Sequence, residues 1–174
     1  MLKVIAFDVF GTVVDLSEAP REEVRAYARH IHQPQWQPLV LPESWARFSA
    51  HPDAALGIAR LRQDYLVVTC SNGPLGLLAK LSKHNGISWD AIIPLELNRV
   101  YKPSPRAYLT VCEVLGVLPQ EVMMVTANKD FGDLEASAAL GMTPMLIRGE
   151  TQKTILDLAW LLELGQEGGG GDRS

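Results

Sequence analysis

The feature that most constrains this chain is a regular alternation between short apolar runs and helical stretches. The apolar runs are rich in β-forming residues and nearly continuous, as expected for strands buried on both faces of a parallel sheet. They cover Lys3–Asp8, Leu66–Cys70, Ala91–Pro94, Val122–Thr126 and Thr143–Ile147. Helical patterns follow at Asp53–Gln63, Leu75–His84, Pro105–Gly116, Asp133–Leu140 and Thr151–Leu164. This alternation predicts an α/β fold with a doubly wound parallel sheet and right-handed crossovers.

One stretch, residues 15–50, interrupts the alternation. It holds a charged helical pattern, Glu18–His32, and then a segment rich in Pro and Trp. We interpret it as an insertion between the first strand and the next strand–helix unit. The length of 174 residues fits one domain. We therefore expect a single domain over residues 1–165 and a flexible, glycine-rich tail over residues 166–174.

Charge and composition narrow the function classes. The net charge is −4, and the 16 Lys and Arg residues form no basic run, so we expect no nucleic-acid partner. Cys70 and Cys112 lack the spacing of a zinc site or a disulfide framework, and we expect both to be reduced and buried. The chain begins MLKVIAFD, unlike a signal peptide, and has no run of the ~20 apolar residues that a membrane helix needs. We expect a cytoplasmic protein that acts on a small molecule; a homodimer stays open.

The first predicted strand ends in an acidic residue, Asp8. Ligands of open α/β sheets bind at the carboxyl ends of the strands, which is where a nucleophile would lie. Gly11 would allow a tight turn and a close approach of the backbone to a ligand, and Thr12 adds a hydroxyl group. The alternative is structural, because an Asp in this position can instead cap the next helix.

Three further polar groups follow predicted strands or precede predicted helices. Ser71, Asn72 and Gly73 bring a hydroxyl, an amide and backbone N–H groups to a helix start, which suits an anion but equally suits a helix cap. Lys102 lies in Tyr-Lys-Pro-Ser-Pro, where two prolines would hold the cation in place; the alternative is a solvated loop lysine.

The third group lies in the loop after the fourth predicted strand. There, Asn128, Asp130 and Asp133 could coordinate a hard cation or orient a water molecule. The alternative is a capped helix start with acids on the surface.

Taken together and in this order, the four signals resemble the motifs of the haloacid dehalogenase superfamily. Asp8, Ser71, Lys102 and Asp133 match its strand-one Asp, strand-two Ser or Thr, Lys before a helix and acid after strand four. The resemblance covers roughly residues 1–148 except the insertion. It implies a five-stranded sheet in the order 5-4-1-2-3 with Asp8 at the centre, and a catalytic role for these four residues.

The residues around the motifs separate two activities within that superfamily. Its phosphatases carry a second Asp two residues after the nucleophile, where this chain has Phe10, which has no titratable group. Where they place a metal-binding Asp, five residues before Asp133, this chain has Asn128. A magnesium-dependent phosphatase, with Asp8 and Asp133 as metal ligands, is therefore the second hypothesis.

The L-2-haloacid dehalogenases look closer. Their pattern of an aromatic residue followed by Gly-Thr is similar to Phe10-Gly11-Thr12. Their Ser-Asn-Gly is similar to residues 71–73, and their Tyr-Lys-Pro with a later Tyr is similar to residues 101–103 with Tyr108. In the fourth motif the chain departs at two of three positions, and reads Asn128-x-Asp130-x-x-Asp133.

This second resemblance implies a mechanism without a cofactor or metal. Asp8 would displace the halide, Lys102 would keep Asp8 ionised, and Asp133 would position the hydrolytic water. Ser71 would hold the substrate beside Asp8. The further substrate contacts implied are Phe10, Gly11, Thr12, Asn72, Gly73, Tyr108, Asn128 and Asp130.

The insertion departs from the dehalogenase pattern. Those enzymes carry a larger cap there, which supplies an arginine for the halide and an apolar pocket. The candidates for that arginine here are Arg21, Arg25, Arg29 and Arg47, and none lies in a recognisable motif. We expect a small, open lid. A third hypothesis is a non-catalytic binding protein that keeps this fold.

Overall fold

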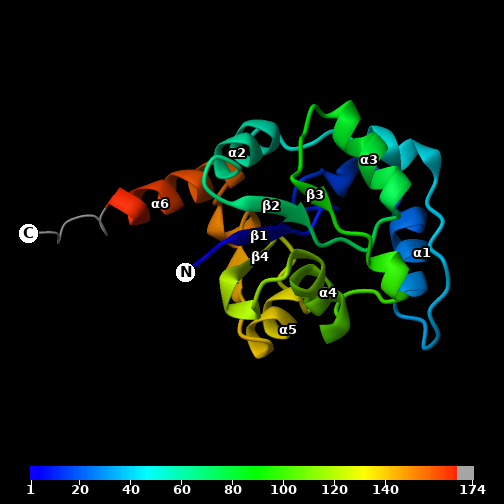
Figure 1. Cartoon of the computed structure of the whole chain (residues 1–174). Helices are drawn as coiled ribbons and strands as arrows, with labels where there is room; N and C mark the ends of the chain where they lie inside the picture. Colours follow the sequence, from blue (N-terminus) through cyan, green and yellow to red (C-terminus); the bar gives the residue numbers. More distant parts are fainter. Residues whose placement is uncertain (168–174) are drawn as a thin grey trace, which may run out of the picture.

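The computed structural model describes residues 1–167, which contain one five-stranded sheet (Figure 1). All strand pairs in it are parallel, and the order is β3-β2-β1-β4-β5. The strands are β1 (Val4–Phe7), β2 (Leu66–Thr69), β3 (Ala91–Ile92), β4 (Val122–Thr126) and β5 (Thr143–Leu146). The predicted α/β fold and its strand order are confirmed, with β1 at the centre of the sheet.

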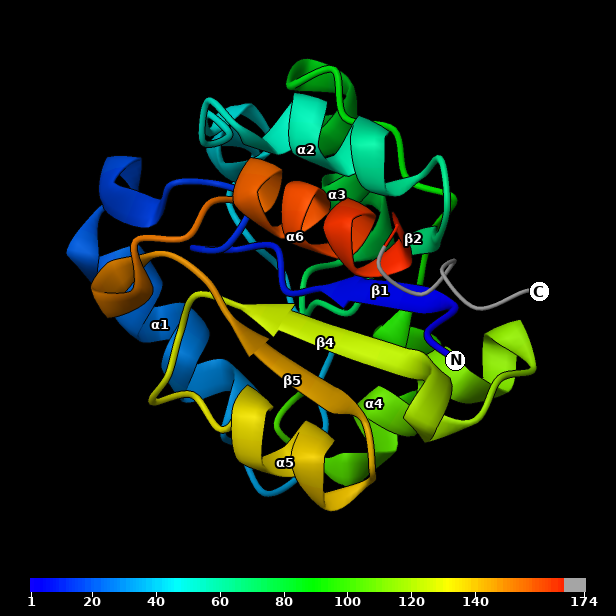
Figure 2. The same cartoon turned by 90° about the vertical axis from the view of Figure 1, so that its left-hand side faces the viewer.

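Helices cover both faces of the sheet (Figure 2). One face carries α2 (Ala54–Leu61), α3 (Leu75–His84) and α6 (Ile155–Glu167), and the other carries α4 (Pro105–Leu115) and α5 (Asp133–Ala139). Gly57 lets α2 and α6 approach closely, because a Cβ atom at this position would lie 2.6 Å from Ile155 Cγ2. Within residues 1–167 no helix combines the length and apolar character needed to cross a bilayer.

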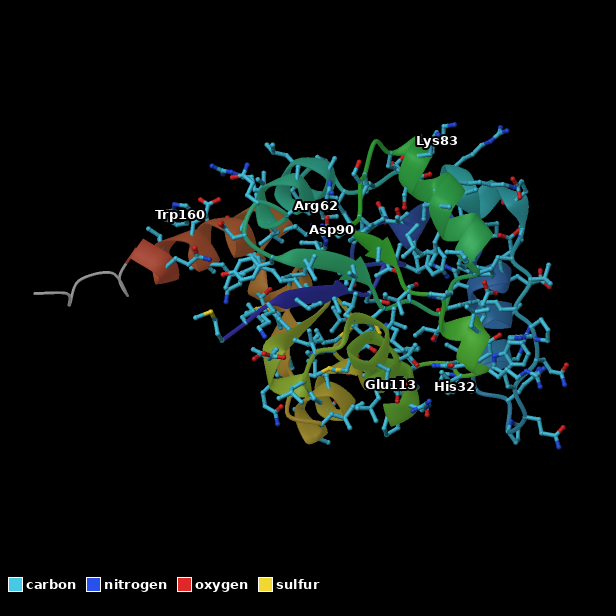
Figure 3. The ribbon with its side chains drawn as sticks, in the orientation of Figure 1. His32, Arg62, Lys83, Asp90, Glu113 and Trp160 are labelled. Carbon is cyan, nitrogen blue, oxygen red and sulfur yellow. The ribbon has the colours of Figure 1, made fainter. Side chains whose placement is uncertain are left out.

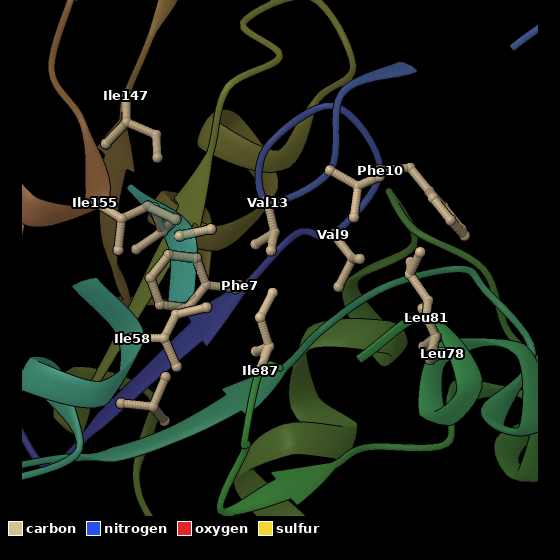
Figure 4. Packing of buried hydrophobic residues seen from close by; sticks show 14 of the residues in the cluster. Phe7, Val9, Phe10, Val13, Ile58, Leu78, Leu81, Ile87, Ile147 and Ile155 are labelled. Carbon is tan, nitrogen blue, oxygen red and sulfur yellow. The ribbon is translucent and has the colours of Figure 1, made fainter. Parts of the chain in front are cut away.

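The central strand supplies both halves of the hydrophobic core. Successive side chains of a strand point to opposite faces, and accordingly Ile5 and Phe7 pack with α2, α3 and α6, whereas Val4 and Ala6 pack with α4. Phe7 is fully buried and lies near Ile58, Ile147 and Ile155 (Figure 4). This burial on both faces explains why the strand reads as a continuous apolar run.

Some predicted boundaries differ from those observed, for reasons in the local sequence. β3 ends at Ile92, because Ile93 N donates to the Thr69 hydroxyl and Pro94 has no N–H. The predicted closing helix begins four residues later, at Ile155, where Thr154 and Asp157 form a reciprocal capping pair.

The same helix also runs further than the predicted Leu164, to Glu167, so Gln166 and Glu167 are helical rather than part of the tail. Gln166 Nε2 donates to the Tyr65 hydroxyl at 2.9 Å, which fastens this end of α6. The remainder of the predicted tail, residues 168–174, lies outside the described residues. Cys70 and Cys112 are free and buried, as predicted.

The insertion lies beyond the carboxyl ends of the strands (Figure 1). Its helix α1 (Arg21–Ile31) starts after Pro20, three residues later than predicted, and a short 3-10 helix, Glu43–Arg47, follows an irregular segment. Trp45 is fully buried in the core, and its indole N–H donates to Glu23 of α1 at 2.7 Å. The insertion is therefore a small lid that is fastened to the core by its own aromatic residue.

Candidate active site

Asp8 follows the last residue of β1 and is held by the turn behind it. The turn uses Gly11 at φ 89°, a left-handed conformation that favours glycine. It brings the Thr12 hydroxyl to Asp8 Oδ2, to which it donates at 2.8 Å. The same hydroxyl accepts a hydrogen bond from Ala127 N at 2.8 Å, so Thr12 links the end of β1 to the loop after β4.

A buried lysine joins two carboxylates at this point. Lys102 Nζ lies 2.8 Å from Asp8 Oδ1 and 3.0 Å from Asp133 Oδ2, and only 1% of the Lys102 side chain is exposed. The three residues come from the end of β1, the loop before α4 and the start of α5. Asp133 is fully buried, and its other oxygen accepts a hydrogen bond from the Tyr108 hydroxyl at 2.5 Å. The predicted contact between Lys102 and Asp8 is present.

Burial and the neighbouring charges shift the pKa values of Asp8 and Lys102. Burial raises the pKa of the Asp8 carboxyl above its usual value; Lys102 and the Thr12 hydroxyl oppose this effect, and Asp133 adds to it. Burial alone would lower the pKa of Lys102, but the carboxylates of Asp8 and Asp133 raise it well above its usual value. Lys102 is therefore a permanent cation at neutral pH.

The Ser71–Gly73 turn positions the lysine. The Asn72 side chain accepts from Lys102 N at 2.6 Å and donates to Lys102 O at 3.1 Å, so it holds the lysine backbone at both ends. Ser71 is buried, and its hydroxyl accepts a long hydrogen bond of 3.4 Å from Gly73 N. A Cβ atom at Gly73 would lie 2.8 Å from the Phe10 ring, so glycine is needed here.

Aromatic side chains form the wall beside Asp8. Phe10 is 6% exposed, and its ring centroid lies 5.9 Å from that of Tyr27 and 5.2 Å from that of Trp45. Burial raises the pKa of Tyr27, and the nearby Asp8 carboxylate raises it further, whereas the Asn72 amide lowers it. The Tyr27 hydroxyl therefore stays protonated, and the packing of its ring on Phe10 makes Tyr27 part of the aromatic wall.

Sequence reasoning missed Tyr27, although a signal exists. Val24, Tyr27, Ala28 and Ile31 recur at helical spacing and define the inward face of α1.

Sequence reasoning also missed Arg148, which contacts the turn that holds Asp8. Arg148 Nε donates to the Thr12 carbonyl at 2.7 Å, and its guanidinium group pairs with both oxygens of Asp53 at 3.0 and 3.2 Å. Arg148 adopts φ 61° and ψ −162°, a conformation that is strained for a residue with a side chain. No motif in the sequence signals this contact, because Asp53, Thr12 and Arg148 meet only in the fold.

The other predicted substrate contacts lie either at the surface or buried against Asp133. Asn128 and Asp130 are exposed, and the Asn128 side chain accepts from Asp130 N at 3.1 Å in a local turn. Tyr108 is fully buried and touches Asp133, so it orients that acid from the protein interior. All four candidate arginines of the insertion, Arg21, Arg25, Arg29 and Arg47, are exposed.

The carboxylates are arranged around an ammonium group and do not suit a magnesium ion. All four oxygens of Asp8 and Asp133 already accept hydrogen bonds, from Lys102, Thr12 and Tyr108. Across residues 1–167, no group of three or more His, Cys, Asp or Glu side chains could hold a metal. Magnesium needs near-octahedral oxygen ligands, which this arrangement does not supply.

A carboxylate at the end of the central strand, paired with a buried ammonium, is suited to covalent catalysis by an aspartate. The family model described as haloacid dehalogenase-like hydrolase matches residues 41–139, more than half of the chain. The chain belongs to the haloacid dehalogenase-like hydrolases and is an enzyme of that family.

Characterised proteins similar in sequence to this chain include two that are named (S)-2-haloacid dehalogenases. The chain is 28% identical to (S)-2-haloacid dehalogenase from Xanthobacter autotrophicus, over 91% of this chain and 83% of that enzyme. It is 34% identical to (S)-2-haloacid dehalogenase 4A from Burkholderia cepacia, over 51% of this chain and 39% of that enzyme. The Xanthobacter alignment extends over 212 positions, more than the 174 residues of this chain, so that enzyme has residues that the chain lacks.

Solved structures agree with the fold. A defluorinating L-2-haloacid dehalogenase superposes with a TM-score of 0.77 at 27% identity, covering 93% of this chain and 95% of that one. The Xanthobacter autotrophicus L-2-haloacid dehalogenase with chloropropionic acid covalently bound has a TM-score of 0.72 at 23% identity, covering 94% and 88%, and supports the fold alone.

Proposed function

We propose that the protein hydrolyses L-2-haloacids through an ester on Asp8, without a metal ion. The observation that carries this proposal is the buried Lys102 ammonium, which lies between the carboxylates of Asp8 and Asp133. It supplies the positive charge that a metal supplies in other carboxylate sites. The names of the relatives support the choice of substrate.

In the first step an Asp8 oxygen attacks the carbon that bears the halogen. A carbon–oxygen bond forms, the carbon–halogen bond breaks, and the halide leaves with the bonding electrons. Attack from the side opposite the halogen inverts that carbon. The Ser71–Gly73 turn and the aromatic wall of Phe10 and Tyr27 would border the substrate, and a charged substrate favours the hydroxyl and N–H donors of the turn.

In the second step water attacks the carbonyl carbon of the Asp8 ester. The bond between this carbon and the ester oxygen, which came from Asp8, breaks, so the 2-hydroxy acid leaves with that oxygen and the water oxygen restores the Asp8 carboxylate. Asp133 takes one proton from the water and passes it to the departing alkoxide, and the second proton goes to solvent as Asp8 becomes a carboxylate again. The buried Asp133 suits this role because Lys102 and Tyr108 fix both of its oxygens.

The test is halide release from L-2-chloropropionate, with the D enantiomer and a phosphoester with magnesium as comparison substrates. We expect turnover of the L acid only, an inverted 2-hydroxy acid as product, and no loss of rate with a chelator. Asp8→Asn should abolish turnover, because an amide is a poor nucleophile.

Isotope labelling tests the ester directly. In a single turnover in 18O-water with excess enzyme, the product should carry unlabelled oxygen from Asp8. Labelled product in that turnover would show direct attack by water. Phosphoester hydrolysis that needs magnesium, without halide release, would replace the proposal with a phosphatase.

A further inference from the structure

A cavity of about 310 Å³ lies between the lid and the segment that carries the catalytic lysine. One wall comes from the end of α1 and the residues after it, namely residues 31–34 and Trp36, and the other comes from residues 99–104. His32 marks the end of α1 in Figure 3. The lid is tied to the opposite wall here, because the Tyr101 hydroxyl donates to the Gln37 carbonyl at 2.5 Å.

The cavity adjoins the catalytic cluster. Lys102 lies in its wall, and Lys102 Nζ contacts Asp8 at 2.8 Å. The Phe131 ring lies 5.7 Å from Lys102 Nζ and 6.1 Å from the ring of His32, another wall residue. A substrate whose reacting carbon is at Asp8 could therefore extend its far end into this space.

Besides Lys102, the cavity wall offers a second positive charge, Arg99, and a hydrogen-bond donor, Trp36. Arg99 Cζ lies 6.0 Å from the centre of the Trp36 ring, and that ring stacks on Tyr101 with centroids 6.1 Å apart. In the described chain, residues 1–167, Arg99 pairs with no carboxylate. Trp36 Nε1 is buried and has no hydrogen-bond acceptor among the same residues.

The backbone of Arg99 has a positive φ angle. Its φ is 51°, in the left-handed region where glycine or asparagine is usual. This conformation ends the 3-10 helix Leu95–Asn98. The Arg99 guanidinium and the Trp36 indole N–H, which has no acceptor among residues 1–167, are suited to a carboxylate, which accepts hydrogen bonds from both groups.

We propose that Arg99 and Trp36 bind a second carboxylate of the substrate, so that the preferred substrates are 2-halo dicarboxylic acids. The dehalogenation of these acids rests on the proposed function, whereas the carboxylate site itself does not. The site would give the enzyme specificity for a long, doubly charged acid, with recognition shared between the core and its short lid.

Binding of unhalogenated acids tests the site apart from the chemistry. Hexanedioate and hexanoate have the same length and differ in the terminal carboxylate. By calorimetry on the full chain, we expect hexanedioate to bind about 10-fold more tightly, as one charge-assisted contact allows. Arg99→Gln should remove this preference, and Trp36→Phe, which keeps the ring but loses the N–H, should reduce it. Arg60→Gln, at an exposed arginine of α2 outside the cavity wall, should keep it.

Turnover then separates the two proposals. L-2-bromohexanedioate should exceed L-2-bromohexanoate in kcat/KM by about 10-fold, through KM, and Arg99→Gln should equalise them. Equal affinities and equal kcat/KM values for the two acids in the wild-type protein would overturn the carboxylate site and leave the dehalogenase intact. Arg99-dependent binding without any halide release would support the site and refute the dehalogenase.

Discussion

Lys102 lies between two carboxylates, so its charge affects the ionisation of the nucleophile. Asp8 must be ionised to attack carbon, and burial raises the pKa of its carboxyl, although Lys102 lowers it. We therefore expect kcat/KM to fall with decreasing pH at a higher pH than an exposed aspartate would give. In Lys102→Met the lowering effect is lost, so this acid limb should move to still higher pH, together with a large loss of rate.

The measurement is kcat/KM for L-2-chloropropionate against pH, with the melting temperature of each variant as a control for folding. An acid limb at the same pH in both proteins would show that Lys102 does not set the ionisation of Asp8.

Phe10 occupies the position of the second acid of related phosphatases, but its ring is part of the aromatic wall. Phe10→Asp would bury a carboxylate against Tyr27 and Trp45, so we expect a loss of roughly 3–5 kcal/mol in the free energy of unfolding. We expect no gain of phosphoester hydrolysis with magnesium. Phe10→Leu, which keeps an apolar side chain, should cost much less. Denaturant unfolding and a phosphatase assay check both points, and magnesium-dependent turnover by a stable Phe10→Asp protein would contradict them.

Between elements, the contact of Arg148 with Thr12 connects β5, α2 and the turn after β1. The Asp53–Arg148 pair is largely buried, and Thr12 in turn donates to Asp8. In Arg148→Ala the turn loses this support and Asp8 moves relative to the substrate. Misplacement of this kind reduces rates by roughly 10- to 100-fold, so we expect kcat to fall and KM to change little.

Arg62 offers a matched control. It pairs with Asp90 at 2.9 Å on the surface (Figure 3), where both side chains are partly exposed. Arg62→Ala should leave kcat unchanged and alter stability by about 1 kcal/mol or less. If both variants lose kcat equally, or if Arg148→Ala acts through KM, then Arg148 does not position the nucleophile.

In the whole molecule, the protection of backbone amides from hydrogen exchange should decrease from the centre of the sheet toward the lid. β1 and β4 are buried and paired on both sides, whereas residues 34–42 of the lid form no helix or strand. Hydrogen exchange measured by mass spectrometry should therefore show slow exchange at Val4–Phe7 and Val122–Thr126, and fast exchange at residues 34–42. The peptide that contains Trp45 should exchange more slowly than residues 34–42. Equal exchange throughout the insertion would show that Trp45 does not fasten the lid.

The sequence predicts the sheet well because its strands are buried on both faces and therefore read as unbroken apolar runs. It also predicts the meeting of Asp8 with Lys102, since Asp8 lies in a motif at the carboxyl end of a strand and Lys102 lies in a motif of the same family before a helix. It does not predict the contacts of Arg148 or Tyr27, because each depends on side chains brought together by tertiary packing. Asn128 is a further case, because a local turn satisfies its amide and leaves it at the surface.

The sharing of one ammonium between two carboxylates has a consequence for product release. Before the reaction, Asp8, Lys102 and Asp133 together carry one net negative charge. In the proposed cycle, ester formation removes the charge of Asp8 and leaves the cluster neutral while it holds the bound acid. Hydrolysis restores the charge beside the newly formed anionic product. Like charges in a partly buried site repel, so the chemical step itself would drive the hydroxy acid out and prepare the site for the next substrate.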